Sequence, residues 1–318
     1  MRGQSSLYLK AQRLPGTGPM VWKRIYRDRY LLFMLIPVFA YYLIFHYVPM
    51  YGVTIAFKDY NMFEGIFRSP WVGMDNFRRI FSTSDFYTVL RNTLLLNLLS
   101  LIFGFPGPII LALLLNELRN MAFKKSIQTI AYLPHFLSWV VVANMFIPML
   151  SPTSGIVNRL ITFLGGETVY FMADKTWWVV VYVALGIWKG IGWGAIIYLS
   201  ALTGIEQQLY EAATIDGAGK WKQLLHITLP GIAPTISVLL ILNVGGIMSI
   251  GFDQAYLLGN GTVIEVSDVI STYVYRLGLL SADISRSTAI GLFQSVVNLV
   301  MLLATNYFTK KMSGQGIY

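Results

Sequence analysis

The sequence predicts an all-α integral membrane protein with six transmembrane helices. Of its 318 residues, 55% are apolar and only 12% are charged, about half the charged share of an ordinary soluble domain. Its mean hydropathy is +0.59, and several runs longer than about 20 residues carry no charge. A chain of this length cannot hide so much apolar surface in one soluble core. Lipid must therefore be the solvent for much of it.

Six apolar runs account for the predicted spans. They cover residues 30–57, 92–116, 127–150, 177–202, 232–252 and 287–309. Each can form a helix that crosses about 30 Å of hydrocarbon, and in lipid a single segment satisfies its backbone only as a helix. Only the fourth run holds a charge, Lys189. Prolines inside or beside the runs predict kinks: Pro37, Pro49, Pro106, Pro108, Pro134 and Pro148.

Basic and acidic residues are distributed unequally between the two sides of the membrane. An even number of spans puts both termini on one side, and the segments on that side hold 14 basic and five acidic residues. The loops on the other side hold eight basic and ten acidic residues. Cytoplasmic loops carry an excess of Lys and Arg, so both termini are expected in the cytoplasm. The net charge of +9 is then a sign of topology, and no nucleic-acid partner is expected.

The loops complete the predicted organisation. A cytoplasmic N-terminal segment (1–29) precedes the transmembrane domain (30–309), and a cytoplasmic tail (310–318) follows it. The large loops are 51–91, 151–176 and 253–286 outside and 204–231 inside. The first outside loop is rich in aromatic residues, which is typical of an interfacial belt with a short amphipathic helix and equally of a docking surface.

The cytoplasmic loop 204–231, termed the elbow below, has the pattern of two short helices joined by a glycine. Ile205, Leu209 and the pair 212–213 recur at spacings of three and four, which predicts an amphipathic helix. Gly217 can end that helix in the left-handed conformation. A second short helix follows around Trp221, and Pro230 is expected to break the chain before the fifth span.

Two interpretations fit these residues. The elbow can lie among lipid headgroups, where Lys220, Trp221 and Lys222 suit the interface. It can also be a rigid element that fits a cleft in a moving partner protein and transmits the partner's motion to the adjoining spans.

A motif in the elbow resembles the EAA loop of binding-protein-dependent ABC importer permeases. Glu-Ala-Ala at 211–213, Gly217, Ile227 and Leu-Pro at 229–230 occupy every position of that motif. The stretches 70–79, 132–139, 186–193 and 268–276 are similar to the branch that imports complex oligosaccharides and polysaccharide fragments, alginate among them. The likeness therefore extends over nearly the whole chain.

The resemblance implies the permease fold of a type I ABC importer in the cytoplasmic (inner) membrane. This chain and a related second permease would form the path, with two ABC ATPase subunits below and an external solute-binding protein above. The substrate would be an oligosaccharide or polysaccharide fragment. ATP and Mg would be bound by the ATPases, and no cofactor is expected on this chain. The resemblance puts these elbow residues at the ATPase joint: Glu211, Ala212, Ala213, Ile215, Asp216, Gly217 and Ala218.

The chain has no residue pattern for ATP hydrolysis or for a metal site. Gly219-Lys220 is followed by Trp221, where a P-loop needs Ser or Thr. The three histidines, His46, His135 and His226, have no ligand-like spacing, and the chain has no cysteine. We therefore predict a transport subunit without enzymatic activity.

Polar residues inside the spans are candidates for the substrate path, because in lipid they usually face a cavity or another helix. Lys189 can pair with a carboxylate across a subunit interface, which is the favoured interpretation, or attract an acidic sugar such as an alginate oligosaccharide. Gly186, Gly190 and Gly194, spaced four apart, favour close helix packing over substrate contact. The candidate path residues are Asn144, Lys189, Trp193, Asn243, Asp253 and Gln254.

The alternative function is an ion-coupled secondary sugar transporter. Such proteins usually place carboxylates in the middle of the membrane. No Asp or Glu lies well inside a predicted span of this chain, so the importer permease is preferred.

Overall fold

The structure is a computed structural model that describes residues 26–313. The remainder of the predicted N-terminal segment and tail lies outside the described residues. The chain divides into two compact units, residues 1–54 and 55–318. The described elements are helices and turns, with one isolated bridge between Lys58 and Trp71. The all-α prediction is confirmed.

The first unit contains the helix α2 (Arg29–Tyr42), which continues through a π-helical turn (Leu43–Tyr47) into 3₁₀ turns. None of the residues of α2 is buried in this unit. The whole run Arg29–Phe57 is long and apolar enough to cross a membrane. Such a helix needs lipid or another protein around it.

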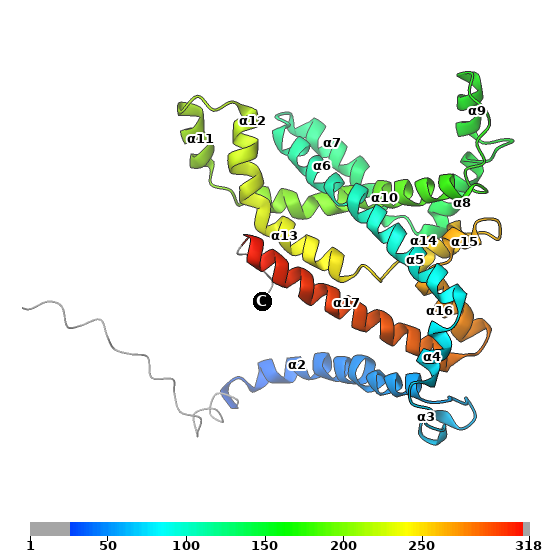
Figure 1. Ribbon diagram of the computed structural model, residues 1–318. Helices are drawn as coiled ribbons and strands as arrows, with labels where there is room; N and C mark the ends of the chain where they lie inside the picture. The colour runs from blue at the N-terminus through cyan, green and yellow to red at the C-terminus, as the bar shows by residue number, and fades with distance from the viewer. Residues whose placement is uncertain (1–25, 314–318) are drawn as a thin grey trace, which may run out of the picture. The chain divides into compact units, whose positions relative to one another are not determined.

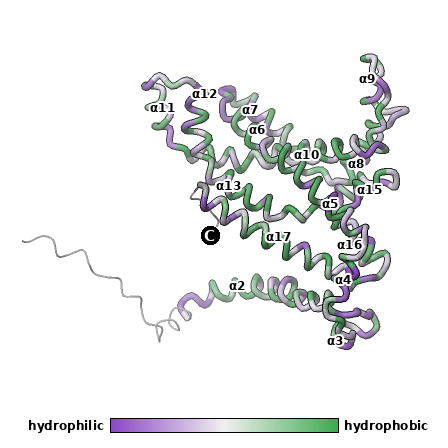
Figure 2. Tube along the Cα trace, in the orientation of Figure 1, coloured by the Kyte–Doolittle hydropathy of each residue, from purple (hydrophilic) through white to green (hydrophobic). Residues whose placement is uncertain are grey.

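The second unit is built on four long helical elements (Figure 1). The first consists of α5 (Ser84–Leu99), a π-helical turn (Ser100–Gly104) and α6 (Pro106–Glu117). The others are α10 (Lys175–Thr203), α13 (Leu229–Gly245) and α17 (Ile284–Ser313). Apolar residues colour the middles of these helices, and hydrophilic residues gather towards their ends (Figure 2).

Short helices lie at the two ends of this unit (Figure 1). One end, termed the elbow end, carries α11 (Gln207–Ile215) and α12 (Lys220–Gln223), and α17 finishes there. The other end, termed the far end, carries six short elements: α3 (Gly65–Arg68), α4 (Asp75–Phe81), α9 (Ile156–Phe163), α14 (Phe252–Leu258), α15 (Ile264–Ser267) and α16 (Ile270–Tyr275).

The third predicted span is sharply bent at Pro134, one of the prolines that predict kinks. α7 (Met121–Tyr132) with its 3₁₀ turn, and α8 (Trp139–Met149), meet at an angle of 101°. Pro134 lies in the turn, and Ser138 adopts an extended conformation in which its hydroxyl accepts a hydrogen bond from the Val141 N–H. A proline and an N-cap end one helix and start another, although the hydropathy of the run is continuous. The described residues therefore hold five candidate spans, or six if the bent pair is one span.

Three predicted boundaries differ from those observed. α5 starts at Ser84, so the last part of the predicted loop 51–91 is helical. α13 ends at Gly245, short of residue 252, because two glycines occur in succession there. Pro230 does not break the chain, and Lys220–Gly245 runs as one helical element. A π-helical turn (Leu224–Thr228) just before the proline widens the helix and makes room for its ring.

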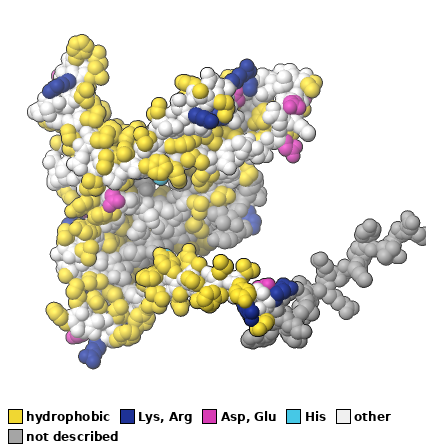
Figure 3. Space-filling view, turned by 180° about the vertical axis from the view of Figure 1, so that it is seen from behind, with side chains coloured by type: hydrophobic (Ala, Val, Ile, Leu, Met, Phe, Trp, Pro, Cys, Tyr) yellow, Lys and Arg dark blue, Asp and Glu magenta, His cyan; other side chains and the backbone are white. Residues whose placement is uncertain are grey.

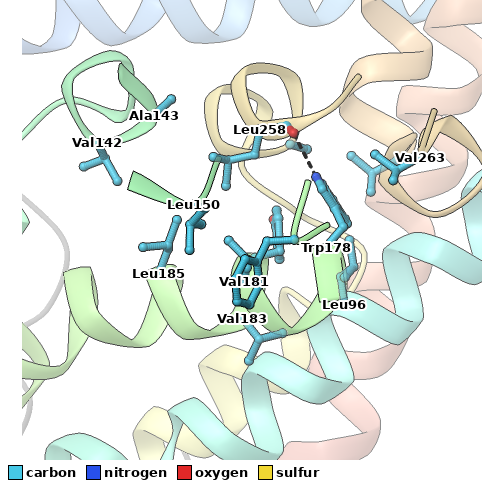
Figure 4. Close-up of a cluster of buried hydrophobic side chains, with 14 residues drawn as sticks. Leu96, Val142, Ala143, Leu150, Trp178, Val181, Val183, Leu185, Leu258 and Val263 are labelled. Carbon is cyan, nitrogen blue, oxygen red and sulfur yellow. Dashed lines mark hydrogen bonds between the residues drawn. The ribbon is translucent and has the colours of Figure 1, made fainter. Parts of the chain in front are cut away.

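Buried contacts of α10 hold the second unit together. Trp178 is fully buried, and its indole N–H donates to the carbonyl oxygen of Leu258 at the end of α14 (2.8 Å; Figure 4). Gly192 allows the backbone of α7 to approach, since a Cβ there would lie 2.0 Å from the carbonyl oxygen of Ala131. These contacts make α10 the central helix of the unit.

Most of the apolar surface of the spans is exposed in the single chain. The buried share is 33% in the apolar part of α10 and only 11% in that of Ser84–Glu117. Hydrophobic side chains accordingly cover much of the visible surface (Figure 3). Lipid or a second subunit must cover this surface in the assembled protein.

Candidate functional site

The elbow forms the turn that the sequence predicts. Gly217 has φ +75°, and the Ala218 N–H donates to the carbonyl oxygen of Ala213 (2.8 Å). This bond closes the end of α11 in the left-handed cap that glycine permits. Any other residue would be strained at this φ value.

The elbow exposes most of the residues that its motif singles out. Ala213 and Ala218 are half-buried, and Ile215 is 87% exposed. Exposed residues also include Glu211, Ala212, Asp216 and Gly217. The motif residues of the elbow are therefore accessible from outside the chain.

Partly buried hydrogen bonds join the two halves of the elbow. Gln223 is only 8% exposed, and its Nε2 donates to Thr214 Oγ1 (3.0 Å) and to the carbonyl oxygen of Ala218 (3.1 Å). The hydroxyls of Tyr210 and Thr228 lie 3.0 Å apart and link α11 to the π-helical turn. These bonds fix the angle between α11 and α12. Gln223 was not singled out from the sequence, where its only signal is an amide beside the apolar residues of a short helix.

A groove of about 1070 Å³ lies between the elbow and the end of α6. Glu211 and Ile215 line it. Lys220 Nζ lies 3.1 Å from Glu117 Oε2, and both residues line the groove as well. Both side chains are largely exposed, so this ion pair contributes less than about 1 kcal/mol.

A second cavity, of about 440 Å³, lies among α5, α6, α10 and α13. Its polar lining consists of Asn97, Ser100, Asn243 and Gln254, with Tyr198 beside them. Its volume is within the range of small-molecule binding sites, which are typically about 300–1,000 Å³.

Three of the four glycines of α10, Gly186, Gly190 and Gly194, line this cavity, but their surroundings differ. A Cβ at Gly194 would lie 2.8 Å from Pro108 Cγ, so this glycine packs against α6. A Cβ at Gly190 would meet nothing within 4 Å, and one at Gly186 would lie 3.5 Å from the amide of Gln254. Helix packing therefore explains the glycine at position 194, whereas the absence of a side chain at Gly190 leaves open space in the cavity.

Two of the candidate path residues line the cavity. The amide of Gln254 donates to the Tyr182 carbonyl oxygen (2.7 Å), and that of Asn243 donates to the Leu239 carbonyl oxygen of its own helix (2.8 Å). Asn97 lies on the same cavity and donates to the Ile247 carbonyl oxygen (2.7 Å). These amides are positioned by backbone acceptors.

The other candidates lie away from this cavity. Asn144 donates to the Val140 carbonyl oxygen within α8, and Asp253 is exposed on α14. Trp193 stacks on the ring of His135, with 4.5 Å between centroids.

Lys189 finds its partners within the chain. Its Nζ donates to the carbonyl oxygen of His135 (2.8 Å), at the bend between α7 and α8, and lies 5.6 Å from the centroid of the Trp139 ring. The ammonium thus gains a hydrogen bond and a cation–π contact. None of the described carboxylates forms an ion pair with it.

Comparison with known proteins gives one consistent result. The family described as "Binding-protein-dependent transport system inner membrane component" matches residues 104–314. The chain is 45% identical to protein LplB of Bacillus subtilis (strain 168), over 95% of each chain. It is 46% identical to the polygalacturonan/rhamnogalacturonan transport system permease protein YteP of the same organism, over 93% of this chain and 92% of YteP.

Two crystal structures are similar to the fold. One is of a bacterial ABC transporter involved in the import of the acidic polysaccharide alginate, with 43% identity and a TM-score of 0.86 over 92% of this chain and 99% of that chain. The other is of a bacterial alginate ABC transporter in complex with an alginate pentasaccharide-bound periplasmic protein. Its identity and TM-score are the same, over 93% and 99% of the two chains.

These findings support the importer and give no support to the ion-coupled alternative. The chain belongs to the family of binding-protein-dependent transport system inner membrane components, and it is the permease, the transport subunit, of an ABC importer.

Proposed function

We propose that this permease imports acidic oligosaccharides derived from polysaccharides, driven by ATPase subunits that dock on the elbow. The observation that carries the coupling role is the elbow itself, a rigid and exposed unit with a complete EAA motif. The substrate class is supported by the names of two relatives, which refer to polygalacturonan/rhamnogalacturonan and to the acidic polysaccharide alginate.

The helical continuity of Lys220–Gly245 supplies a direct mechanical link. An ATPase that moves α11 also moves α12, because Gln223 ties the two helices together. α12 continues into α13, whose Asn243 lines the membrane cavity. Closure of the ATPase dimer would thus move α11, α12 and α13 together and change the shape of the membrane cavity. We propose that this cavity is part of the sugar path.

Three further partners complete the proposed importer. A second, related permease would cover part of the exposed apolar surface of the spans. Two ABC ATPase subunits would bind the elbow, and they would hold ATP and Mg. An external solute-binding protein would deliver the sugar, which agrees with the periplasmic protein bound in one of the similar crystal structures.

The proposed orientation places the elbow end, where α17 finishes, in the cytoplasm, and an even number of spans would put the N-terminus on the same side. The basic residues at that end support this orientation under the positive-inside rule. They are Arg119, Lys124, Lys125, Lys220, Lys222, Lys310 and Lys311.

The test is to purify the tagged chain in detergent with its co-expressed partners and to measure ATP hydrolysis after reconstitution. We expect a second permease and an ATPase to co-purify, and the loaded binding protein with a galacturonate or alginate oligosaccharide to stimulate hydrolysis.

Glu211→Lys should reduce ATPase recovery, whereas Lys222→Glu, a change at an exposed residue of α12 outside the motif, should not. Equal recovery for both variants would contradict docking on the elbow, and stimulation by neutral oligosaccharides alone would contradict the acidic substrate.

A further inference from the structure

A third cavity, termed the outer cleft, lies at the far end of the second unit and has no role in the function proposed above. It measures about 250 Å³ and is walled by α14, α15 and α16. Its aromatic residues are Tyr256 and Tyr275, and its polar residues include Asn260, Asp268 and Arg276.

The aromatic wall of the outer cleft is held by a third ring. Phe252 stacks on Tyr256 with 4.9 Å between centroids and an interplanar angle of 19°. Tyr275 lies 5.0 Å from Phe252 and 5.5 Å from Tyr256. Tyr256 is nevertheless 50% exposed. Two tyrosines with fixed rings thus offer apolar faces and polar hydroxyls in one place, and this combination suits the C–H face and the hydroxyl groups of a pyranose.

The polar side of the outer cleft is formed by the guanidinium of Arg276, which Asp268 holds in one orientation. The carboxylate of Asp268 is almost buried, and it accepts hydrogen bonds from Thr272 Oγ1 (2.7 Å) and from Arg276 Nη2. Arg276 also lies over the ring of Tyr273, 5.5 Å from its centroid. A guanidinium has five N–H donors in a planar fork, so these contacts fix its direction while donors remain for a ligand. The pair contributes no net charge, which favours hydroxyl groups over a carboxylate as the ligand groups.

The walls of the outer cleft are fixed to the spans. Trp178 of α10 holds the end of α14 through the Leu258 carbonyl oxygen (Figure 4). Asn92 of α5, 1% exposed, donates to the carbonyl oxygens of Glu265 and Asp268, both at 2.9 Å. A cleft with walls anchored in this way is preorganised, which lowers the ordering cost of binding.

We propose that the outer cleft binds one neutral pyranose face of the transported oligosaccharide, stacked on Tyr256 and hydrogen-bonded by Arg276. The membrane cavity and the outer cleft meet α14 on different sides, since Gln254 lines the first and Tyr256 the second. We expect a chain of several sugar units to contact both sites, and a disaccharide bound in the membrane cavity to leave the outer cleft empty, because the two linings share no residue. The inference rests on oligosaccharide transport by this permease and not on the acidity of its substrate.

The first test compares uptake of a long and a short oligosaccharide by the reconstituted importer with saturating loaded binding protein. Tyr256→Ala should lower the uptake rate of a galacturonate or alginate pentasaccharide about tenfold relative to the disaccharide, the loss of about 1.4 kcal/mol of binding. Tyr256→Phe keeps the ring and should behave like the parent chain. Equal losses for both sugar lengths, or no loss at all, would overturn the proposal. A parent importer that transports neither sugar would instead refute the proposed substrate.

The second test uses the absence of cysteine from the chain. Leu280 lines the outer cleft and is 66% exposed, so Leu280→Cys provides a single site on this chain for a hydrophilic maleimide, and its labelling is read from this chain's band after the assembled importer is separated into subunits. We expect labelling that slows in excess oligosaccharide, while labelling of Ser154→Cys, at an exposed position outside the cleft, stays constant. No labelling at Leu280→Cys would mean that another subunit covers the cleft, and labelling unaffected by sugar would mean that the cleft is empty during transport. Either result would overturn the proposal.

Discussion

Lys189 carries a charge inside a span, and its ammonium group finds its partners within the same chain. Its ammonium meets the His135 carbonyl oxygen and the Trp139 ring at the bend between α7 and α8. A bend leaves a backbone carbonyl without its helical donor, and in lipid an unsatisfied group of this kind is costly. The bend therefore gives this ammonium partners that do not depend on a substrate or on a second subunit.

Lys189→Met should accordingly lower stability and leave substrate preference unchanged. A hydrogen bond from a charged group contributes about 1.5–3 kcal/mol, so the unfolding temperature of the purified importer should fall by several degrees. Uptake of acidic and neutral oligosaccharides should decline in the same proportion, and Lys189→Arg, which keeps a charged donor, should be milder. Selective loss of acidic uptake would instead indicate that Lys189 contacts the substrate.

Gly190 and Gly192 provide a matched pair for testing the membrane cavity. A Cβ at Gly190 has open space around it, while one at Gly192 would lie 2.0 Å from the Ala131 carbonyl oxygen. Gly190→Leu should therefore insert and fold normally but fill part of the cavity and block uptake. Gly192→Ala should separate α7 from α10 and reduce the amount of folded protein. Size-exclusion profiles and uptake assays distinguish the two, and normal transport by Gly190→Leu would exclude the cavity from the sugar path.

At the scale of the element, the turn of the elbow can be predicted from the sequence, whereas the hydrogen bond that joins its two helices cannot. The motif and its glycine are contiguous, so the turn at Gly217 could be predicted from local spacing. The bond from Gln223 to Thr214 joins residues on two helices, and no periodicity reports which side chains face each other across a turn.

Gln223→Leu should uncouple ATP hydrolysis from transport. The substitution keeps the side-chain size but removes the two hydrogen bonds that Gln223 donates to Thr214 and to the Ala218 carbonyl oxygen, a loss of about 1–3 kcal/mol in total. The elbow should still bind the ATPase through its exposed face, while less of its movement reaches α13. We expect normal co-purification and a lower ratio of sugar transported to ATP hydrolysed, with Lys222→Gln on the exposed side of α12 as the control. An unchanged ratio would show that the angle of the elbow is held by other contacts.

Pro134 lies at a bend, as predicted, but three other prolines do not interrupt the helical path. In three cases a π-helical turn ends two residues before a proline, and the helical path continues beyond it. The pairs are Leu43–Tyr47 with Pro49, Ser100–Gly104 with Pro106, and Leu224–Thr228 with Pro230. A π-helical turn accommodates one extra residue, so the ring fits without a break. Sequence rules treat proline as a helix terminator, and this explains why the continuity of Lys220–Gly245 could not be predicted.

At the scale of the molecule, hydropathy was sufficient for the number of spans and insufficient for their arrangement. Each apolar run is a local property, and five of the six correspond to helices of spanning length. The cavity depends on which face of α10 meets α6, α13 and α14, and the sequence spacing of Gly186, Gly190 and Gly194 is equally consistent with packing and with open space. The kink at Pro134 was predicted, but the start of a new helix after Ser138 was not, because a polar cap weighs little in an apolar run.

Because so much apolar surface of the spans is exposed, the stability of this chain should depend on the subunits bound to it. At most a third of the apolar window of any span is buried within the chain, and a partner that binds only the folded state stabilises it by mass action. The chain purified alone in detergent should therefore unfold at least about 5 °C below the same chain bound to the second permease. The fluorescence of its eight tryptophans reports the transition, and co-expression with an unrelated permease should give no increase. Equal unfolding temperatures with and without the second permease would show that lipid or detergent alone completes this surface, and would contradict the heterodimer.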